Sequence, residues 1–547
     1  MPRLTGGQAL VQSLEREGLA TLFGLPGVQL DWAYDALYEA RDRIDVVHTR
    51  HEQATAYMAD GYARTTGEIG ACMVVPGPGL LNASAALATA YACSSPVLCV
   101  AGQIPTGAID KGYGMLHEVR HQYELMGSFT KWVGRAERPS AVPGVVREAF
   151  RQLRIGRPRP VGIEVPADML QMSEEVTLHE PSDVERSAGD PALLRQAAEL
   201  LRAAERPLIY SGGGTLMAGA WDELRALAEL LKAPVVMSTD GRGALSDRHY
   251  LAQNGLSGMR LLPQADLVLA VGTRFFQPAV AWGIPPGARV IRIDIDADEI
   301  ARHGAPIVGI VGDARYALAA LRDLLDGAPR RPSRETELRA AREQAEALLA
   351  PIQPQQAYSD AIRAALPDDG IVVADLTQVA FFATLGFPVY CPRTFIGPGY
   401  QGTLGSAFAT ALGAQVGSPG KKVVALMGDG GFMYNVQELA TMRQRHLNVV
   451  AIVFNDNAYG NVRRTQREVF AGHVIAADLV NPDFVALADS FGVRGLRVTA
   501  PNALRSALGD ALAANEPILI EVAVGEMPSA WHLVGPAGGG YPVLLPS

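Results

Sequence analysis

Two acidic side chains stand directly after two apolar runs in the last third of the sequence. Asp429 lies in the segment GDGG (428–431) after VVALM, and Asp456 lies in the turn NDNAYG after VVAIVF. Such apolar runs predict buried strands of a parallel sheet, and ligands bind these sheets at the carboxyl ends of the strands. Magnesium prefers hard oxygen ligands and often shares them with a phosphate. The spacing therefore predicts a magnesium site with Asp429, Asp456 and the carbonyl of Ala458 as ligands.

The glycines beside Asp429 suit the binding of a phosphate. Gly430 and Gly431 let backbone N–H groups approach an anion closely, and the helix-like run that follows offers its positive end. A GDG segment alone is more often only a strand-to-helix turn. Because a second oxygen-rich turn follows the next predicted strand, we favour metal and diphosphate binding.

These residues need sheets to position them, and the sequence predicts three. Short apolar runs alternate with helix-like runs in residues 1–175, 190–325 and 352–547. Strands that are apolar on both faces and alternate with helices indicate doubly wound parallel sheets. Two charged stretches, 173–190 and 327–349, predict a linker and a connector with a solvated helix. We therefore expect an α/β protein of three doubly wound parallel-sheet domains.

Composition excludes several classes of protein. The 547 residues are 48% hydrophobic and 19% charged, which suits several well-packed domains. A formal charge of −9 without a Lys/Arg block gives no surface for nucleic acid. The N-terminus lacks the apolar core of a signal peptide, and no apolar run approaches roughly 20 residues, so we expect no membrane partner. Four cysteines without a CxxC pair are typical of reduced thiols, and the expected location is cytoplasmic.

Glu52 opens the helix-like run EQATAYMADGYAR after the predicted strand IDVVHT. An acidic residue at a helix N-terminus is ordinary by itself, because it offsets the helix dipole. Together with the later GDGG segment and Asn-rich turn, however, it resembles the thiamine diphosphate (ThDP)-dependent enzyme superfamily, in its acetolactate synthase-like (large, catalytic subunit) branch. The resemblance covers nearly the whole chain. One departure is Asp456, which takes the place of the second asparagine of a pair in the family; a carboxylate remains a sound magnesium ligand.

The resemblance implies a pyrimidine-binding N-terminal domain, a Rossmann-like middle domain and a C-terminal domain that binds the ThDP diphosphate through Mg²⁺. It implies that Glu52 is the catalytic carboxylate, hydrogen-bonded to N1′ of the aminopyrimidine, so that the imino tautomer removes the proton from thiazolium C2. In the family this glutamate and the diphosphate site come from different subunits. At least a homodimer is therefore implied, and a homotetramer is common.

Further residues are expected in the cofactor cleft by the same resemblance. Leu404 takes the place of the bulky apolar residue that holds ThDP bent, although ordinary core packing would also explain it. The full set of expected cofactor-binding residues is Pro26, Gly77, Pro78, Asn82, Thr377, Gln378, Gly402, Thr403, Leu404, Gly428, Gly430, Gly431 and Tyr459.

Three residues are expected on the substrate side. Gln103 lies in a segment that lines the family's active site, and His117 stands where acetolactate synthases typically read the glutamine of Phe-Gln-Glu. His117 would bind a substrate carboxylate or transfer protons, although a lone histidine is more often structural. Val28 replaces the second glycine of the family's segment after Pro26 and puts a β-branched side chain near the reacting carbon. The tryptophan that selects 2-oxobutyrate is missing, with Thr465 near its place, so the acceptor stays open.

The middle region resembles the FAD-binding domain of acetolactate synthases and pyruvate oxidases at Ser211–Gly214 and in the run IRIDIDADEI. Glycines after a strand are weak signals alone. The family's usual flavin stretch after Gly272–Phe275 is replaced by FQPAVAWG. FAD therefore stays an open alternative, the less favoured one.

The leading expectation is decarboxylation of a small 2-oxo acid such as pyruvate, with transfer of the activated aldehyde to a second carbonyl compound, as in acetolactate synthase. The alternatives on the same scaffold are a non-ligating 2-oxo acid decarboxylase, which the bulk of Val28 favours, an FAD-dependent oxidase and a diketone-cleaving enzyme. A ThDP-binding regulator without catalysis is disfavoured, because Glu52, Asp429 and Asp456 are all present.

Overall fold

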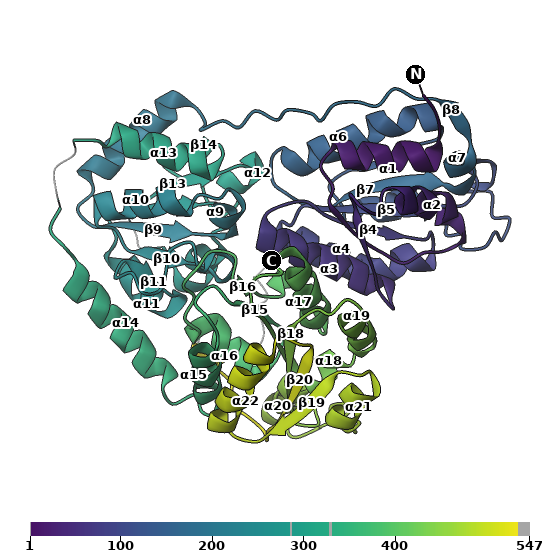
Figure 1. Ribbon diagram of the computed structural model, residues 1–547. Helices are drawn as coiled ribbons and strands as arrows, with labels where there is room; N and C mark the ends of the chain where they lie inside the picture. The colour runs from purple at the N-terminus through teal and green to yellow at the C-terminus, as the bar shows by residue number, and fades with distance from the viewer. Residues whose placement is uncertain (1, 285–286, 328–330, 534–547) are drawn as a thin grey trace.

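The computed structural model describes residues 2–284, 287–327 and 331–533. Three six-stranded sheets, each with all its strands parallel, form the centres of three lobes, with helices packed around each sheet (Figure 1). This architecture confirms the expected fold class. Residues 534–547 of the expected C-terminal domain lie outside the described residues.

The first sheet has the strand order β3-β2-β4-β5-β7-β6. Its order reverses between β2 and β4, and parallel sheets bind ligands at such switch points. The segments after β2, β3 and β4 hold Pro26, Glu52 and Gly77, so all three lie at the carboxyl edge of this sheet. The strands are β2 (Thr21–Gly24), β3 (Asp45–His48), β4 (Gly70–Val74), β5 (Val97–Gln103), β6 (Val133–Arg135) and β7 (Val161–Pro166), and the helices are α1 (Gly6–Arg16), α2 (Asp31–Glu39), α3 (Glu52–Thr66), α4 (Pro78–Cys93), α5 (Gln122–Gly127), α6 (Val142–Arg154) and α7 (Ala167–Gln171).

The second sheet has the order β11-β10-β9-β12-β13-β14 and reverses between β9 and β12. Its central strands β9, β10 and β12 are buried along their whole length, as their apolar sequences predict. The strands are β9 (Pro207–Ser211), β10 (Val235–Met237), β11 (Ala252–Gln253), β12 (Leu267–Val271), β13 (Arg289–Asp294) and β14 (Val308–Val311), and the helices are α8 (Pro191–Ala203), α9 (Gly213–Met217), α10 (Trp221–Leu231), α11 (Gly255–Leu261), α12 (Ala297–Ile300), α13 (Ala314–Leu324) and α14 (Glu335–Leu349).

The third sheet has the order β16-β15-β17-β18-β20-β19 and reverses between β15 and β17. Asp375 and Asp429 directly follow the strands β15 and β17 on either side of this switch point. The strands are β15 (Ile371–Ala374), β16 (Phe395–Ile396), β17 (Val423–Gly428), β18 (Val449–Asn455), β19 (Arg494–Val498) and β20 (Ile518–Ala523), and the helices are α15 (Gln355–Ala365), α16 (Gln378–Gly386), α17 (Ser406–Gly417), α18 (Asp429–Phe432), α19 (Leu439–Gln444), α20 (Gly460–Val469), α21 (Phe484–Ser490) and α22 (Pro501–Ala514).

Helices α3 and α17 join the N-terminal and C-terminal lobes of the chain (Figure 1). They touch through their backbones: a Cβ on Gly61 would lie 2.0 Å from the carbonyl oxygen of Thr410, and one on Gly413 would lie 2.0 Å from that of Met58. One hydrophobic core continues across the contact, from Phe23 of the first sheet to residues of the third. The start of α3, where Glu52 stands, is therefore fixed against the C-terminal lobe of the same chain.

The segments between the lobes agree only in part with what the sequence predicts. The connector helix α14 forms within the expected stretch 327–349. The expected linker 173–190 is wrong at its start, because β8 (Ser173–Glu175) pairs with β1 (Arg3–Thr5) in an antiparallel ladder. A pairing between residues so far apart leaves no local signal in the sequence. Across the described residues, no helix combines the length and the apolarity that a membrane span requires.

Candidate active site

Two carboxylates stand at the carboxyl ends of adjacent strands in the C-terminal lobe. Asp429 begins α18 directly after β17, Asp456 follows the last residue of β18, and the two strands pair in parallel. Asn481 joins the two turns, because its Nδ2 donates to Oδ2 of Asp429 at 2.6 Å and to Oδ1 of Asn455 at 3.0 Å. The structure thus brings together the two turns that the sequence predicts to hold a metal. The sequence did not single out Asn481.

The electrostatics of this pair favour a divalent cation. Burial raises the pKa of Asp429, which is 1% exposed. Burial and the Asp429 carboxylate raise the pKa of Asp456 to about 6, against the opposing effect of Arg463. Two like charges in a partly buried site repel each other, and a cation between them relieves that repulsion.

The residue types around this pair fit Mg²⁺ better than a metal held by side chains alone. Within the described residues, no three His, Cys, Asp or Glu side chains group in a way that could hold a metal ion. Further ligands to Asp429 and Asp456 must therefore be backbone, phosphate or water oxygens, and Mg²⁺ accepts such a set. The turn of Ala458, the predicted backbone ligand, is held by hydrogen bonds from Tyr459 N to Ala477 O and from Leu479 N to Asn457 O, both 2.8 Å.

Four of the expected cofactor-binding residues meet beside this turn. A Cβ on Gly430 would lie 2.5 Å from the ring of Tyr459, and one on Gly428 would lie 3.5 Å from Cβ of Thr377. The close approach of Tyr459 alone explains why Gly430 has no side chain. The glycines of the GDGG segment thus have a packing reason as well as the predicted binding role.

Asp375 ties the loop 402–405 to the start of α16. Its Oδ2 accepts from Gly405 N at 2.9 Å and its Oδ1 accepts from Leu376 N at 2.7 Å. The carboxyl group is 2% exposed, and burial raises its pKa to about 6. A Cβ on Gly431 would lie 3.3 Å from the same carboxylate. Asp375 therefore supports the three expected diphosphate segments from behind.

The other predicted residues of this lobe lie around the same loop. Oγ1 of Thr403 is 3.1 Å from Oγ1 of Thr89, which lies on α4 of the N-terminal lobe. Leu404 is half-buried, which suits either of its expected roles. The side-chain oxygen of Gln378, in the amide orientation that satisfies its neighbours, accepts from Arg464 at 3.2 Å.

The N-terminal lobe gathers a second group of predicted residues at the carboxyl edge of its sheet. Glu52 begins α3, and Nδ2 of Asn82 on α4 donates to its Oε2 at 2.9 Å. Gly77 and Pro78 form the start of α4. Gly77 has a φ of +58°, and a Cβ there would lie 2.4 Å from the carbonyl oxygen of His117. The structure therefore places Glu52, Gly77, Pro78 and Asn82 in one group.

Val28 and His117 flank this group. Nδ1 of His117 lies 3.0 Å from Oε1 of Gln29, and Nε2 of Gln29 donates to the carbonyl oxygen of Leu116 at 3.0 Å. Val28 is 67% exposed, and Pro26 is exposed as well. Gln29, the residue after Val28, thus holds the segment of Leu116 and His117.

Gln103 is placed differently from the other predicted catalytic residues. Its side chain is 2% exposed, with Nε2 donating to Oε1 of Glu164 at 3.2 Å. The fully buried Glu164 also accepts from Arg135 and from Gln122, whose Oε1 in turn accepts from Gly77 N at 2.8 Å. In the chain alone, Gln103 therefore belongs to a buried network that supports the Gly77 turn. The only signal of this network in the sequence is the glutamate inside the apolar strand VGIEVP, which is Glu164.

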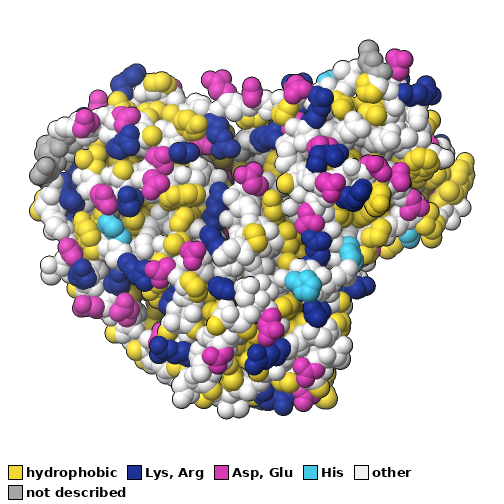
Figure 2. Space-filling view, viewed as in Figure 1, with side chains coloured by type: hydrophobic (Ala, Val, Ile, Leu, Met, Phe, Trp, Pro, Cys, Tyr) yellow, Lys and Arg dark blue, Asp and Glu magenta, His cyan; other side chains and the backbone are white. Residues whose placement is uncertain are grey.

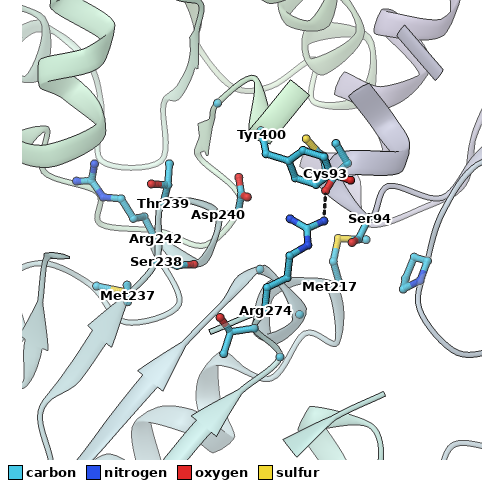
Figure 3. Close-up of a pocket in the computed structure, with 18 of the residues that line it drawn as sticks. Cys93, Ser94, Met217, Met237, Ser238, Thr239, Asp240, Arg242, Arg274 and Tyr400 are labelled. Atoms are coloured by element: carbon cyan, nitrogen blue, oxygen red, sulfur yellow. Dashed lines mark hydrogen bonds between the residues drawn. The ribbon is translucent and has the colours of Figure 1, made fainter. Parts of the chain in front are cut away.

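A cavity of about 620 Å³ lies where the three lobes meet, at the carboxyl ends of the middle strands. Arg274 reaches across it toward Tyr400 of the C-terminal lobe, with its guanidinium 4.3 Å from the ring centre, and donates to the carbonyl oxygen of Ala92 at 2.6 Å (Figure 3). The glycine turn after β9 has a packing reason, because a Cβ on Gly214 would lie 2.7 Å from Cα of Gly272.

Comparison with known proteins matches each of the three lobes to a known domain family. The model of the thiamine pyrophosphate enzyme N-terminal TPP binding domain matches residues 4–125, that of the central domain matches 194–321, and that of the C-terminal TPP binding domain matches 375–522. These matches agree in order and position with the three sheets.

Curated relatives match over nearly the full chain. A probable acetolactate synthase large subunit of Methanocaldococcus jannaschii is 34% identical, over 98% of this chain and 94% of its own. The acetolactate synthase isozyme 3 large subunit of Escherichia coli K12 is 33% identical, over 94% and 93%. A probable 2-ketoarginine decarboxylase of Pseudomonas aeruginosa is 37% identical, over 89% and 88%. The chain therefore belongs to the thiamine pyrophosphate-dependent enzyme family, in its acetolactate synthase-like branch.

Proposed function

We propose that the protein uses ThDP and Mg²⁺ to decarboxylate a small 2-oxo acid such as pyruvate and to join the activated aldehyde to a second carbonyl compound. The observation that carries the proposal is the pair Asp429 and Asp456 at adjacent strand ends. Asn481 bonds Asp429 to Asn455, the residue before Asp456, and Gly431 beside Asp429 packs against the loop 402–405. The acetolactate synthases among the relatives support the ligation step.

The residues would divide the work between the two groups. Bound ThDP supplies an acidic thiazolium carbon that adds to a carbonyl group and serves as an electron sink. Asp429, Asp456 and the carbonyl of Ala458 would hold Mg²⁺ against the diphosphate. Glu52, oriented by Asn82, would share a proton with the pyrimidine nitrogen.

The proposed assembly is a homodimer at least, with a homotetramer as the favoured form. Hydrophobic side chains gather at the outer end of the N-terminal lobe (Figure 2). Large apolar side chains are also exposed in both lobes that hold the predicted site residues. They are Val28, Tyr113 and Leu116 in the N-terminal lobe and Met433, Tyr434 and Val480 in the C-terminal lobe. A second copy would cover such surfaces, because contiguous exposed apolar patches mark interaction sites. Several relatives are named large subunits, so a second type of subunit is also proposed as a partner.

The test of the reaction is a screen of 2-oxo acids with the purified protein, ThDP and Mg²⁺. Pyruvate is expected to release carbon dioxide and give an acetolactate-type product, and EDTA or omission of ThDP is expected to stop both. Lack of ThDP-dependent carbon dioxide release from every 2-oxo acid would overturn the proposal.

A non-ligating decarboxylase is the second candidate, and the 2-ketoarginine decarboxylase relative favours it. Val28 tests the difference, because its side chain would crowd an acceptor near the reacting carbon. If ligation is limited by that crowding, Val28→Gly raises the ratio of ligated product to free aldehyde several-fold while total carbon dioxide release changes little. The same screen includes 2-ketoarginine as a substrate. If the wild type and the Val28→Gly variant both give an aldehyde as the sole product, that result favours the second candidate.

FAD remains an alternative ligand of the cavity between the lobes. Its volume lies within the range of ligand pockets, about 300–1,000 Å³. The five arginines that line it are each bonded inside the protein, however: Arg154, Arg157, Arg186, Arg242 and Arg274. These bonds leave further N–H groups on the guanidinium groups, because an arginine has five. The proposed reaction includes no flavin step. The absorption spectrum of the purified protein tests this, because flavin bands would support the oxidase alternative.

A further inference from the structure

Glu438 places a buried carboxylate next to the predicted catalytic glutamate. It ends the short 3₁₀ helix Val436–Glu438 and is 0% exposed. Its Oε1 accepts from the backbone N–H groups of Arg50 and His51, both at 3.0 Å. Its Oε2 accepts from Arg50 N at 3.1 Å and from Oγ1 of Thr441 at 2.6 Å. The carboxylate of one lobe is thus bonded to the main chain of the other.

These contacts fix the backbone from which Glu52 projects. Arg50 and His51 are the two residues before Glu52, and His51 is the N-cap of α3, with its Nδ1 accepting from Gln53 N at 3.2 Å. On the other side, Nε2 of Gln53 donates to the carbonyl oxygen of Tyr434 at 2.8 Å. The segment that contains Glu438 therefore holds the chain both before and after Glu52.

A carboxylate is a costly choice for this purpose. Removing a charge from water is unfavourable unless several donors replace the lost hydration. Burial does raise the pKa of Glu438, and the bonds from Thr441, Arg50 and His51 oppose that effect. The helix already has its own cap at His51. A strong anchor at this place is explained if the position of Glu52, rather than helix stability, is what it serves.

We propose that Glu438 is a positioning residue, which fixes the backbone of Arg50 and His51 and thereby holds the Glu52 carboxylate where it meets the cofactor. The inference rests on the proposed function of Glu52. It predicts that loss of Glu438 slows the proton exchange that Glu52 supports, while the binding of substrate and ThDP persists.

The test is a series of variants of the full-length holoenzyme. Glu438→Ala removes both acceptor oxygens. Glu438→Asp shortens the side chain by one methylene and so moves both oxygens away from their donors. Glu438→Gln keeps one oxygen, which can still accept from the N–H groups of Arg50 and His51 as Oε1 does. The readouts are hydrogen–deuterium exchange at C2 of bound ThDP, kcat, KM and the ThDP Kd. A displacement of about 1 Å at a reacting group can cost about 100-fold in rate. We expect losses of that order in C2 exchange and kcat for Glu438→Ala, smaller losses for Glu438→Asp and the smallest for Glu438→Gln, with KM and Kd within about threefold.

Two further variants separate the explanations. Glu17 is also a buried glutamate, at the C-terminal end of α1 and bonded to Arg154 at 2.6 Å. Glu17→Gln is expected to leave the exchange rate unchanged and controls for the loss of a buried charge. If Glu52→Gln exchanges C2 at the wild-type rate, the proposed function itself fails. If Glu52→Gln is inactive but Glu438→Ala exchanges within threefold of wild type, only the positioning role fails. Should Glu438→Ala not fold, an exchange rate in Glu438→Asp equal to or above that in Glu438→Gln would overturn the proposal.

Discussion

Nδ2 of Asn82 lies 2.9 Å from Oε2 of Glu52, so the first turns of α4 orient a carboxylate at the first residue of α3. Glu52 is half-buried, and its partner is a neutral amide rather than a cation. A carboxylate oxygen can accept this bond from an amide N–H, so Asn82 fixes the direction in which the other oxygen of Glu52 points.

Glu52→Gln is expected to abolish turnover and leave ThDP binding largely intact. An amide has nearly the same shape as the carboxyl group but cannot exchange the proton, and general acid–base catalysis is worth about 10²–10⁴-fold in rate. Steady-state kcat and a ThDP titration measure the two effects separately. Near-normal turnover in this variant would refute the assigned role.

Asp429→Ala is expected to lose magnesium-dependent retention of ThDP. The substitution removes a predicted ligand and releases Asn481 from its 2.6 Å bond, so both the charge and the geometry of the turn change. Losing a metal ligand or its support typically weakens a site by at least about 10–100-fold. Gel filtration with ThDP and Mg²⁺, followed by assay of the bound cofactor, measures the retention. Asp323→Ala, at an exposed aspartate of the middle lobe, is the matched control, and equal retention in the two variants would contradict the metal site.

The sequence predicted the strand ends well and the partners of the site poorly. Asp429 and Asp456 follow apolar runs, so the rule that parallel sheets present functional groups at their carboxyl ends was enough to place them. Glu52 was assigned by its resemblance to the family, and it too lies after a strand of its sheet. Asn481 and Glu438 escaped notice because their partners are 52 residues away in one case and 388 in the other. The contact of Asn481 depends on how the C-terminal lobe folds and that of Glu438 on how two lobes pack, and no local periodicity records either.

Two motifs show a different limit. The turn Ser211–Gly214 looks like a nucleotide-binding signal, yet Gly212 and Gly214 also have a packing reason, because a Cβ on either would meet the backbone of Gly272. Gln103 lies in a segment that resembles the family's active site, but Glu164 holds its amide inside the lobe. A motif records which residue types are present, whereas burial decides which side chains are free to act.

The stability of the fold is expected to carry a pH dependence from Asp375. Burial raises its pKa to about 6 in the folded protein, above the ordinary value of about 4 for aspartate. The folded state therefore binds this proton more tightly than the unfolded state, and the stability due to this group is complete below about pH 4 and is lost as the pH rises through about 6. Asp375→Asn removes the titration, although it also weakens one of the two backbone contacts. The difference in Tm between wild type and variant should narrow from pH 4 to pH 7, and a constant or widening difference would contradict the assignment.

The sharing of one active site between two chains can be tested by mixing two inactive variants. If Glu52 of one subunit serves the metal turn of the other, a mixed dimer of Glu52→Gln with Asp429→Ala contains one site with both residues intact and one site with both changed. Random pairing makes half of the dimers mixed, so co-expression is expected to restore about one quarter of the wild-type activity per site. Each variant expressed alone is the control, because neither can form an intact site in a homodimer. Two chains that co-purify without any restored turnover would show that Glu52 and Asp429 do not meet across the subunit boundary, because in a shared site the mixed dimer must contain one complete set of residues.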